Sequence, residues 1–202
     1  MQIFGHAGIT LGAAVLLSGA LQRSHFSKTE GDSSQTAPNH DDRESWFAFL
    51  GSCIDIRLLL VGSLLPDIID KPIGQFFFRE TFSHGRIFSH TLIFLILVAL
   101  AGLYLYRCHD KIWLLVLSFG IFTHLMLDRM WRSPRTLFWP LFGFTFERID
   151  LTYWVQDMLY ALLAEPGVYI PELVGAAILL WFGVVLARRR KIGVFIRYGQ
   201  LK

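Results

Sequence analysis

Residues 87–106 read IFSHTLIFLILVALAGLYLY, and this stretch decides the fold class of the chain. It contains no Asp, Glu, Lys or Arg. A helix needs about 20 apolar residues to cross the hydrocarbon core of a bilayer, so the stretch is long enough to span one. We therefore predict a membrane-spanning helix at this point of the chain.

Four further stretches extend this prediction to a bundle. Three of them are apolar almost throughout, and they cover residues 1–21, 112–127 and 168–187. The fourth, residues 46–65, is weaker because it reaches spanning length only when Asp55 and Arg57 are included. The sequence thus predicts an all-α, polytopic membrane bundle of about five membrane helices that form a single membrane-embedded domain.

Three segments lie outside the predicted spans. Residues 22–45 are polar and show no periodicity, which predicts a flexible loop. Residues 129–167 mix Trp and Phe with Arg, as is typical of the lipid headgroup level. Within that interfacial segment, residues 151–163 fit an amphipathic helix lying on the membrane surface. Residues 188–202 form a basic C-terminal tail.

The composition of the 202-residue chain excludes several other classes of protein. Charged residues make up 17%, against about 25% in a typical soluble protein, and hydrophobic residues make up 53%. A mean hydropathy of +0.47 excludes a disordered chain and an ordinary soluble enzyme. The net charge of +3 fits membrane flanks better than a nucleic-acid surface, so no nucleic acid is expected as a partner. Cys53 and Cys108 are too few for a disulfide scaffold.

The titratable residues near the predicted spans gather at helix ends. Consecutive spans alternate in direction, so the start of one span and the end of the next lie on the same side of the membrane. The residues that this argument brings together are His6, Asp67, Asp70, His84, Arg86, His90, His124 and Asp128. Polar side chains at membrane depth are costly and usually functional, so this grouping predicts a site.

A metal ion is the ligand that these residue types favour, and its candidate ligands are His6, Asp67, Asp70, His84, His90, His124 and Asp128. His124 and Asp128 are four residues apart and therefore share one face of a helix. Imidazole with carboxylate suits Zn²⁺ or a similar transition metal, and we expect one or two ions. Such an ion lowers the pKa of a bound water toward about 7 and makes it a nucleophile. Each residue alone also has a structural interpretation, because histidine can cap a helix and Asp67 and Asp70 can form a turn.

Four motifs follow one another along the chain. They are Gly5-His6, Leu65-Pro66-Asp67-Ile68-Ile69-Asp70, a block from His84 to His90-Thr91, and His124-x3-Asp128 followed by Trp139-Pro140. In this order they resemble the membrane-bound metal-dependent hydrolases of the YdjM (DUF457) type, although the block ending at His90 is one residue longer than the usual pattern. That family is similar to the zinc-dependent phospholipase C and P1 nuclease group.

The resemblance implies a metal cluster and assigns roles within it. The implied ligands are His6, Asp67, His90, His124 and Asp128. Asp128 would bridge two ions, and Asp67 would be either a ligand or a base for the water.

The sequence therefore predicts a membrane hydrolase in which a metal-activated water attacks the phosphoester of an amphiphilic, phospholipid-like substrate. Asp67, Arg86 and Asp128 are the candidate catalytic residues, with Arg86 stabilising charge on the phosphoryl oxygens. An ion or metal transporter is an alternative, although transporters usually bind their ions near the bilayer midplane. A non-catalytic membrane protein with a stabilising metal is a third hypothesis.

The basic residues also predict an orientation. Most of the 19 Lys and Arg residues fall on the side of the C-terminus, including the run RRRK at residues 188–191. Because cytoplasmic segments carry the excess of Lys and Arg, we expect an integral cell-membrane protein with a cytoplasmic C-terminus and a site that faces outward. Membrane lipid is then the expected partner.

Overall fold

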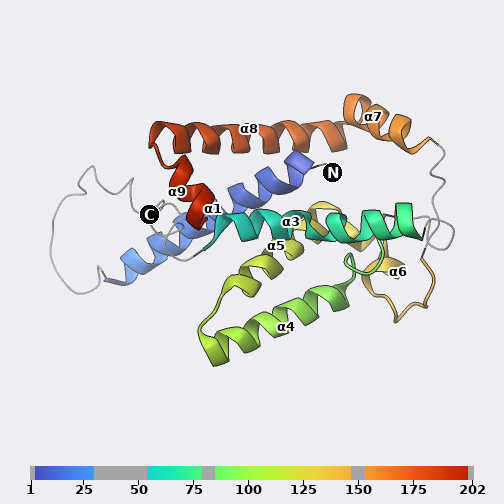
Figure 1. Cartoon of the computed structure of the whole chain (residues 1–202), viewed down its shortest axis with the longest axis horizontal. Coiled ribbons are helices and arrows are strands. Elements are labelled where there is room, and N and C mark those ends of the chain that lie inside the picture. Colours follow the sequence, from blue (N-terminus) through green and yellow to red (C-terminus); the bar gives the residue numbers. More distant parts are fainter. Residues whose placement is uncertain (1–2, 30–53, 79–84, 147–152, 200–202) are drawn as a thin grey trace.

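A computed structural model describes residues 3–29, 54–78, 85–146 and 153–199 of the chain (Figure 1). Every regular element in these ranges is a helix, which confirms the all-α prediction. The longer helices are α1 (Ile3–Thr29), α3 (Ile56–Lys71), α4 (Leu92–His109), α5 (Trp113–Leu127), α7 (Trp154–Ala164), α8 (Pro166–Arg188) and α9 (Ile192–Tyr198). The shorter ones are the π-helical turn η3 (Pro72–Phe77), the 3-10 turn η4 (Met130–Arg132) and α6 (Pro134–Leu137).

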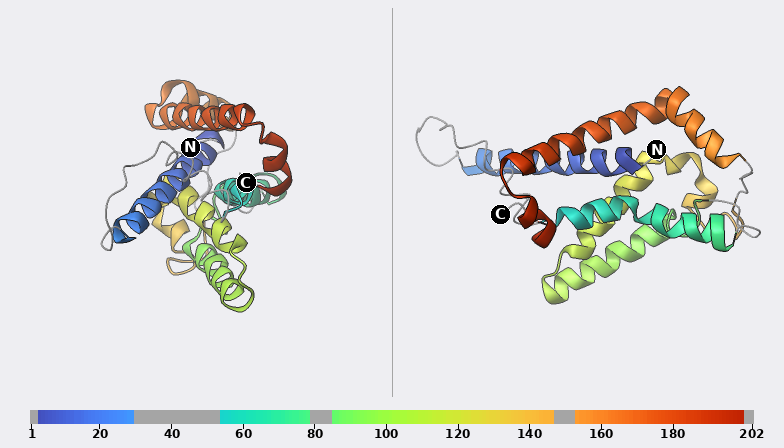
Figure 2. Two further views of the ribbon diagram at one scale, coloured as in Figure 1. Left: turned by 90° about the vertical axis from the view of Figure 1, so that its left-hand side faces the viewer. Right: turned by 45° about the horizontal axis from the view of Figure 1, so that its top comes forward.

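The long helices pack side by side in a fixed order. α8 lies along α1, α1 contacts α3 and α5, α3 runs along α5, and α4 packs on α5 (Figures 1 and 2). α9 turns back from the end of α8 to the start of α3, where Gly199 O accepts a hydrogen bond from Ile56 N at 3.0 Å. The bundle thus has α4 and α8 on its outer sides and the helices that carry the titratable residues between them.

A close approach of two backbones sets the position of α5 against α3. A Cβ atom at Gly120 would lie only 2.7 Å from Leu59 O on α3, so no larger residue fits there without a shift of one helix. Small residues allow such contacts between helices in membranes. This approach brings His124, one turn after Gly120, against the backbone of Ser63 on α3.

The outer helices are the candidate membrane spans. By length and composition, α4 and α8 are the two helices in the described ranges that suffice to cross a bilayer. Their apolar side chains point away from the protein: Leu97 and Leu100 on α4 and Leu180 on α8 are 60%, 57% and 70% exposed. A core helix of a soluble protein would bury such residues, so these faces require an apolar surrounding. The apolar part of α1 (Ile3–Leu17) and α5 are shorter, and the predicted count of five spans is not confirmed.

The third predicted helix begins later than expected. Residues 87–91 form a turn instead of the first turn of a helix, and α4 starts at Leu92. Thr91 is the reason, because its hydroxyl accepts a hydrogen bond from Phe94 N at 3.2 Å and caps the helix. The residues before it are therefore free to bend around a side chain of α3.

The second predicted helix is displaced toward the C-terminus. Asp55 caps α3 by accepting from Arg57 N at 2.9 Å, so the helix starts at Ile56; residues 46–53 lie outside the described ranges. Pro66 lies inside α3, and the helix continues to Lys71. Asp67 and Asp70 are therefore on the last two turns of α3 and do not follow it.

Two segments that the sequence predicts as a loop and a tail are partly helical in the structure. α1 continues as a helix through residues 22–29, which the sequence had assigned to the polar loop, while residues 30–45 are outside the described ranges. The helix predicted at 151–163 is present as α7, Trp154–Ala164. Part of the basic tail forms α9.

Candidate metal centre

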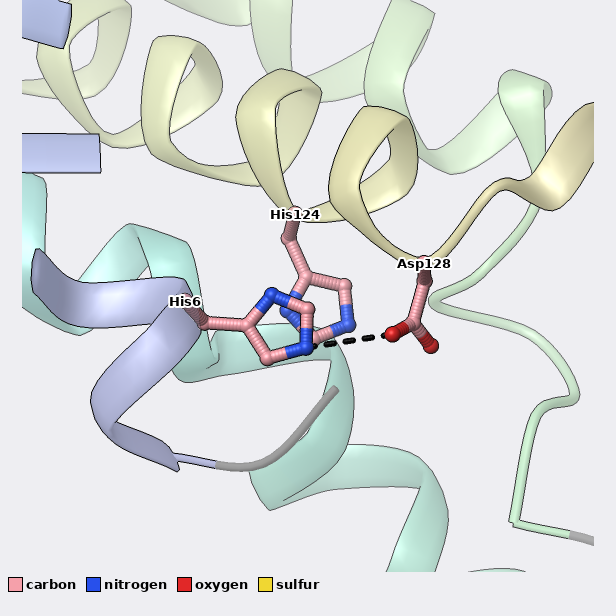
Figure 3. A group of neighbouring side chains, drawn as sticks. All are labelled: His6, His124 and Asp128. Atoms are coloured by element: carbon pink, nitrogen blue, oxygen red, sulfur yellow. Dashed lines mark ion pairs between the residues drawn. The ribbon is translucent and has the colours of Figure 1, made fainter. Parts of the chain in front are cut away.

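Three buried histidines form the centre of the candidate site. His6 comes from the first turns of α1, His90 from the turn before α4, and His124 from the last turn of α5, and all three are 0% exposed. The rings of His6 and His124 stack with centroids 4.1 Å apart, as Figure 3 shows, and His90 meets His124 edge-on at 5.1 Å. Three helix ends thus place three imidazoles within one small volume.

Asp70 fixes the orientation of His90. Its Oδ2 lies 2.7 Å from His90 Nδ1 and accepts a hydrogen bond from Ile87 N at 2.7 Å. Its Oδ1 accepts from the hydroxyl of Ser89, whose backbone N–H also donates to the carboxylate. The turn at residues 87–91 therefore wraps around the Asp70 carboxylate, which is 0% exposed. A carboxylate behind a histidine is the usual support of a metal-binding imidazole.

His124 is held in the same manner by a backbone carbonyl. Its Nδ1 lies 2.7 Å from Ser63 O on α3. A carbonyl oxygen and a carboxylate oxygen only accept hydrogen bonds, so Nδ1 carries the proton in both His124 and His90. The other ring nitrogen of each neutral histidine then presents a lone pair.

These two lone pairs face each other. His124 Nε2 and His90 Nε2 are 3.2 Å apart, with no proton available to either nitrogen in the neutral rings. The arrangement is repulsive unless a cation lies between the two nitrogens. A shared proton would relieve the repulsion between these two nitrogens only. Two carboxylates and a third histidine also surround this point, and a proton between the two nitrogens would not bind them.

The two carboxylates approach the histidines from different helices. Asp67 Oδ1 lies 3.6 Å from His90 Nε2 and 4.0 Å from His124 Nε2. Asp128 Oδ1 lies 3.1 Å from His6 Nε2, and its Oδ2 lies 3.9 Å from His90 Nε2. Each carboxylate therefore offers an oxygen to the same small volume as the imidazole nitrogens.

His6 provides a test of whether a metal fits. Within the described ranges, neither ring nitrogen of this fully buried side chain has a hydrogen-bond partner, although Asp128 is close in distance. A buried polar group without a hydrogen bond is rare and costly, and an ion is one of the few partners that satisfies it. The residues therefore fit a metal ion.

The pKa values of Asp128 and His90, which lie just outside α5 and α4, are also consistent with a bound cation. Burial would raise the pKa of Asp128, but His6 and Arg86 outweigh it and hold that pKa well below its usual range. Burial would lower the pKa of His90, but Asp67 and Asp70 outweigh it and raise that pKa. The Asp128 carboxylate is thus ionised at neutral pH, and the surroundings of His90 favour a positive charge, carried either by a proton or by a bound ion.

Two overlapping groups of residues have the spacing of a metal site. They are His6, His124 and Asp128, and Asp67, His90 and His124, with the ligand atoms of each group within 4.8 Å of one another. Nitrogen and oxygen donors without thiolate suit Zn²⁺ and related transition metals. His124 is common to both groups, so it is the central residue of the site.

The remaining predicted residues have different places. Asp70 lies behind His90 and belongs to neither group, because the turn at 87–91 surrounds its oxygens. Arg86 Nη2 contacts Asp128 Oδ2 at 2.8 Å. His84 lies outside the described ranges.

Sequence reasoning missed two contacts of this site. Lys71 Nζ lies 2.7 Å from Asp67 Oδ2, and the four-residue spacing on one helix is a signal that could have revealed it. The contact of His124 with Ser63 uses a backbone carbonyl, for which a sequence carries no signal.

Comparison with known proteins agrees with the exposed apolar faces of α4 and α8. The model of a family described as "YdjM inner membrane protein" matches residues 1–194. No curated protein and no solved structure gives a match. Because the match covers nearly the whole chain, including every residue of the metal centre, the protein belongs to the YdjM inner membrane protein family.

Proposed function

We propose that the protein is a metal-dependent hydrolase of the membrane that cleaves a phosphoester. The observation that carries the proposal is the pair of Nε2 atoms of His90 and His124, which face each other at 3.2 Å while Asp70 and Ser63 hold their Nδ1 atoms. One or two divalent ions fit, and Zn²⁺ suits the donor set best. An ion bound there would supply an activated water as the nucleophile.

The surrounding side chains have roles in hydrolysis that follow from their positions. His6, His124 and Asp128 would hold one ion, and Asp67 with His90 would either hold a second or accept the proton of the attacking water. The water oxygen forms a bond to phosphorus while the bond from phosphorus to the ester oxygen breaks, and that oxygen takes a proton from solvent. Arg86, whose side chain is 38% exposed, would stabilise the charge on the phosphoryl oxygens.

An aromatic segment beside the site supports an amphiphilic substrate. Phe88, inside the turn that carries His90, packs edge-on against Trp139 at 5.4 Å and Phe146 at 5.5 Å. The same segment exposes Phe142 and Phe144, at 64% and 79%. Tryptophan rings such as that of Trp139 settle at the lipid headgroup level of a membrane protein, where a phospholipid-like substrate presents its phosphoester.

Removal of the metal tests the proposal. Purified protein in detergent is expected to contain one or two equivalents of metal and to hydrolyse a phosphoester, because the nucleophile depends on the ion. Treatment with a chelator should abolish turnover, and added Zn²⁺ or Mn²⁺ should restore it. Metal content is measured by elemental analysis, and hydrolysis by release of the phosphate or the alcohol. Bound metal without turnover on any phosphoester would favour a stabilising metal instead.

We also propose that α1, α3 and α5 share the bilayer with α4 and α8, and that the site faces outward. The packing of α1 along α8 and of α5 along α4 supports a common membrane location. The basic residues near the C-terminus support a cytoplasmic end there.

Cysteine labelling tests this orientation. Cys108 is exposed at the end of α4 remote from His90, whereas Phe142 lies in the aromatic segment beside the site. In a Cys53→Ser background, a membrane-impermeant maleimide should label Phe142→Cys in intact cells. It should reach Cys108 only after permeabilisation. Labelling in the opposite order would place the site in the cytoplasm.

A further inference from the structure

Each carboxylate of the metal centre divides its two oxygens between histidine and a cation. Asp67 turns Oδ1 toward His90 and His124, and its Oδ2 pairs with Lys71 Nζ at 2.7 Å. Asp128 turns Oδ1 toward His6, and its Oδ2, which lies 3.9 Å from His90 Nε2, pairs with Arg86 Nη2 at 2.8 Å. The same arrangement occurs twice, on two elements that are distant in sequence.

Both cations are more exposed than the carboxylates with which they pair. The side chains of Lys71 and Arg86 are 37% and 38% exposed, while those of Asp67 and Asp128 are 14% and 3% exposed. In each of these two ion pairs the cation is therefore the partner that solvent reaches, and the carboxylate is the buried one.

An ordinary surface ion pair does not account for this placement. Such a pair on a helix joins two exposed side chains and contributes little to stability. Here the acidic partner of Lys71 is largely buried and points its other oxygen at two histidines. An ion bound between the histidines would compete for the charge of Asp67 and Asp128 and weaken their attraction to the two cations.

We propose that Lys71 and Arg86 form a two-armed anion clamp that binds the terminal phosphate of an amphiphilic phosphomonoester. This rests on the proposed function and names the substrate class of the same site. In the clamp, each cation exchanges its carboxylate for a phosphoryl oxygen. Lysine acts as a point charge with three donors, and arginine as a planar fork.

The number of arms favours a monoester over a diester. A terminal phosphate has three unesterified oxygens, which suffice for Lys71, Arg86 and the ion. A phosphodiester has two unesterified oxygens and a single negative charge, so one arm of the clamp would keep its carboxylate partner and add nothing to binding. The diester therefore makes one charge-assisted hydrogen bond fewer than the monoester.

Binding of inorganic phosphate to the metal-loaded protein tests the clamp without reference to turnover. Titration calorimetry in detergent should show phosphate binding that Lys71→Gln and Arg86→Gln each weaken by about 10-fold or more, the effect of losing one charge-assisted hydrogen bond. Lys71→Arg should recover most of the affinity. Lys111→Gln is the matched control, because Lys111 is exposed between α4 and α5 at the far end of the bundle. The metal content should stay at the wild-type value in every variant.

The outcomes separate the clamp from the proposed hydrolysis. Unchanged phosphate affinity in Lys71→Gln, or loss of its metal, would overturn the clamp while leaving hydrolysis by the wild type intact. Phosphate binding that depends on Lys71 in a protein without turnover would support the clamp and contradict the hydrolase. Among substrates, short-chain phosphatidic acid should be preferred over phosphatidylcholine, and the preference should fall in Lys71→Gln. A preference for the diester would overturn the monoester assignment.

Discussion

Replacement of His124 by alanine is expected to remove the metal ion that this histidine ligates and to abolish activity. His124 belongs to both groups of candidate ligands, so its loss removes a donor from either possible ion. Loss of a residue that merely supports a ligand weakens metal binding by about 10–100-fold, and loss of a central ligand should exceed that range. Elemental analysis of the detergent-solubilised variant, together with phosphoester hydrolysis, measures both effects.

A histidine remote from the site provides the control for this result. His109 is exposed at the end of α4 opposite to His90, so His109→Ala removes an imidazole without touching the centre. It should keep the metal content and activity of the wild type. Equal metal content in His124→Ala and His109→Ala would show that the ion binds elsewhere and would remove the basis of the hydrolase proposal.

The metal content of a His6→Ala variant indicates how many ions the site binds. It belongs to one of the two groups only, together with His124 and Asp128. If the wild type binds two ions, His124 ligates only one of them, because Nε2 is its single nitrogen with a free lone pair, so His6→Ala and His124→Ala should each leave one equivalent of metal. If the wild type binds a single ion and His6 is one of its ligands, both variants should lose that ion.

The meeting of His6, His90 and His124 could be predicted from the sequence because it depends on topology alone. A chain that reverses direction at every span must return its alternate helix ends to the same side, whatever the packing in between. The spacing of His124 and Asp128 added a shared helix face. The structure places these residues in contact through the packing of α1 and α3 on α5.

The support that Asp70 gives to His90 could not be predicted in this way. The apolar residues around Ile87 suggested a helix, because hydropathy does not reveal that Thr91 caps α4 and leaves a turn before it. Residues of this turn surround Asp70, which therefore supports His90 instead of joining the candidate metal ligands. Such roles depend on where a helix begins to within one residue, and element boundaries are the least certain part of any reading of a sequence.

Replacement of Asp70 by asparagine should weaken metal binding by about 10–100-fold, even though Asp70 is not in contact with the candidate metal position. The Asp70 carboxylate accepts hydrogen bonds from Ile87 N, from Ser89 and from His90 Nδ1. Asparagine has one oxygen and one NH₂ group, so its NH₂ would face a donor. The neutral amide also no longer compensates the positive charge that a bound ion places on His90. Competition with a chelator of known affinity measures the metal dissociation constant.

Ser89→Ala distinguishes orientation of His90 from a general loss of stability. This variant removes the hydroxyl that donates to Asp70 Oδ1 but keeps the contact of Asp70 with His90 Nδ1. We expect the thermal unfolding temperature of the metal-free protein to fall in both variants, because each disturbs a buried hydrogen bond. Metal affinity should fall steeply only in Asp70→Asn. Equal losses of affinity in the two variants would mean that Asp70 holds the turn at 87–91 together without a specific effect on the histidine. A steep loss confined to Asp70→Asn would show that the buried carboxylate tunes the imidazole, and that the metal centre extends beyond its ligands into the turn before α4.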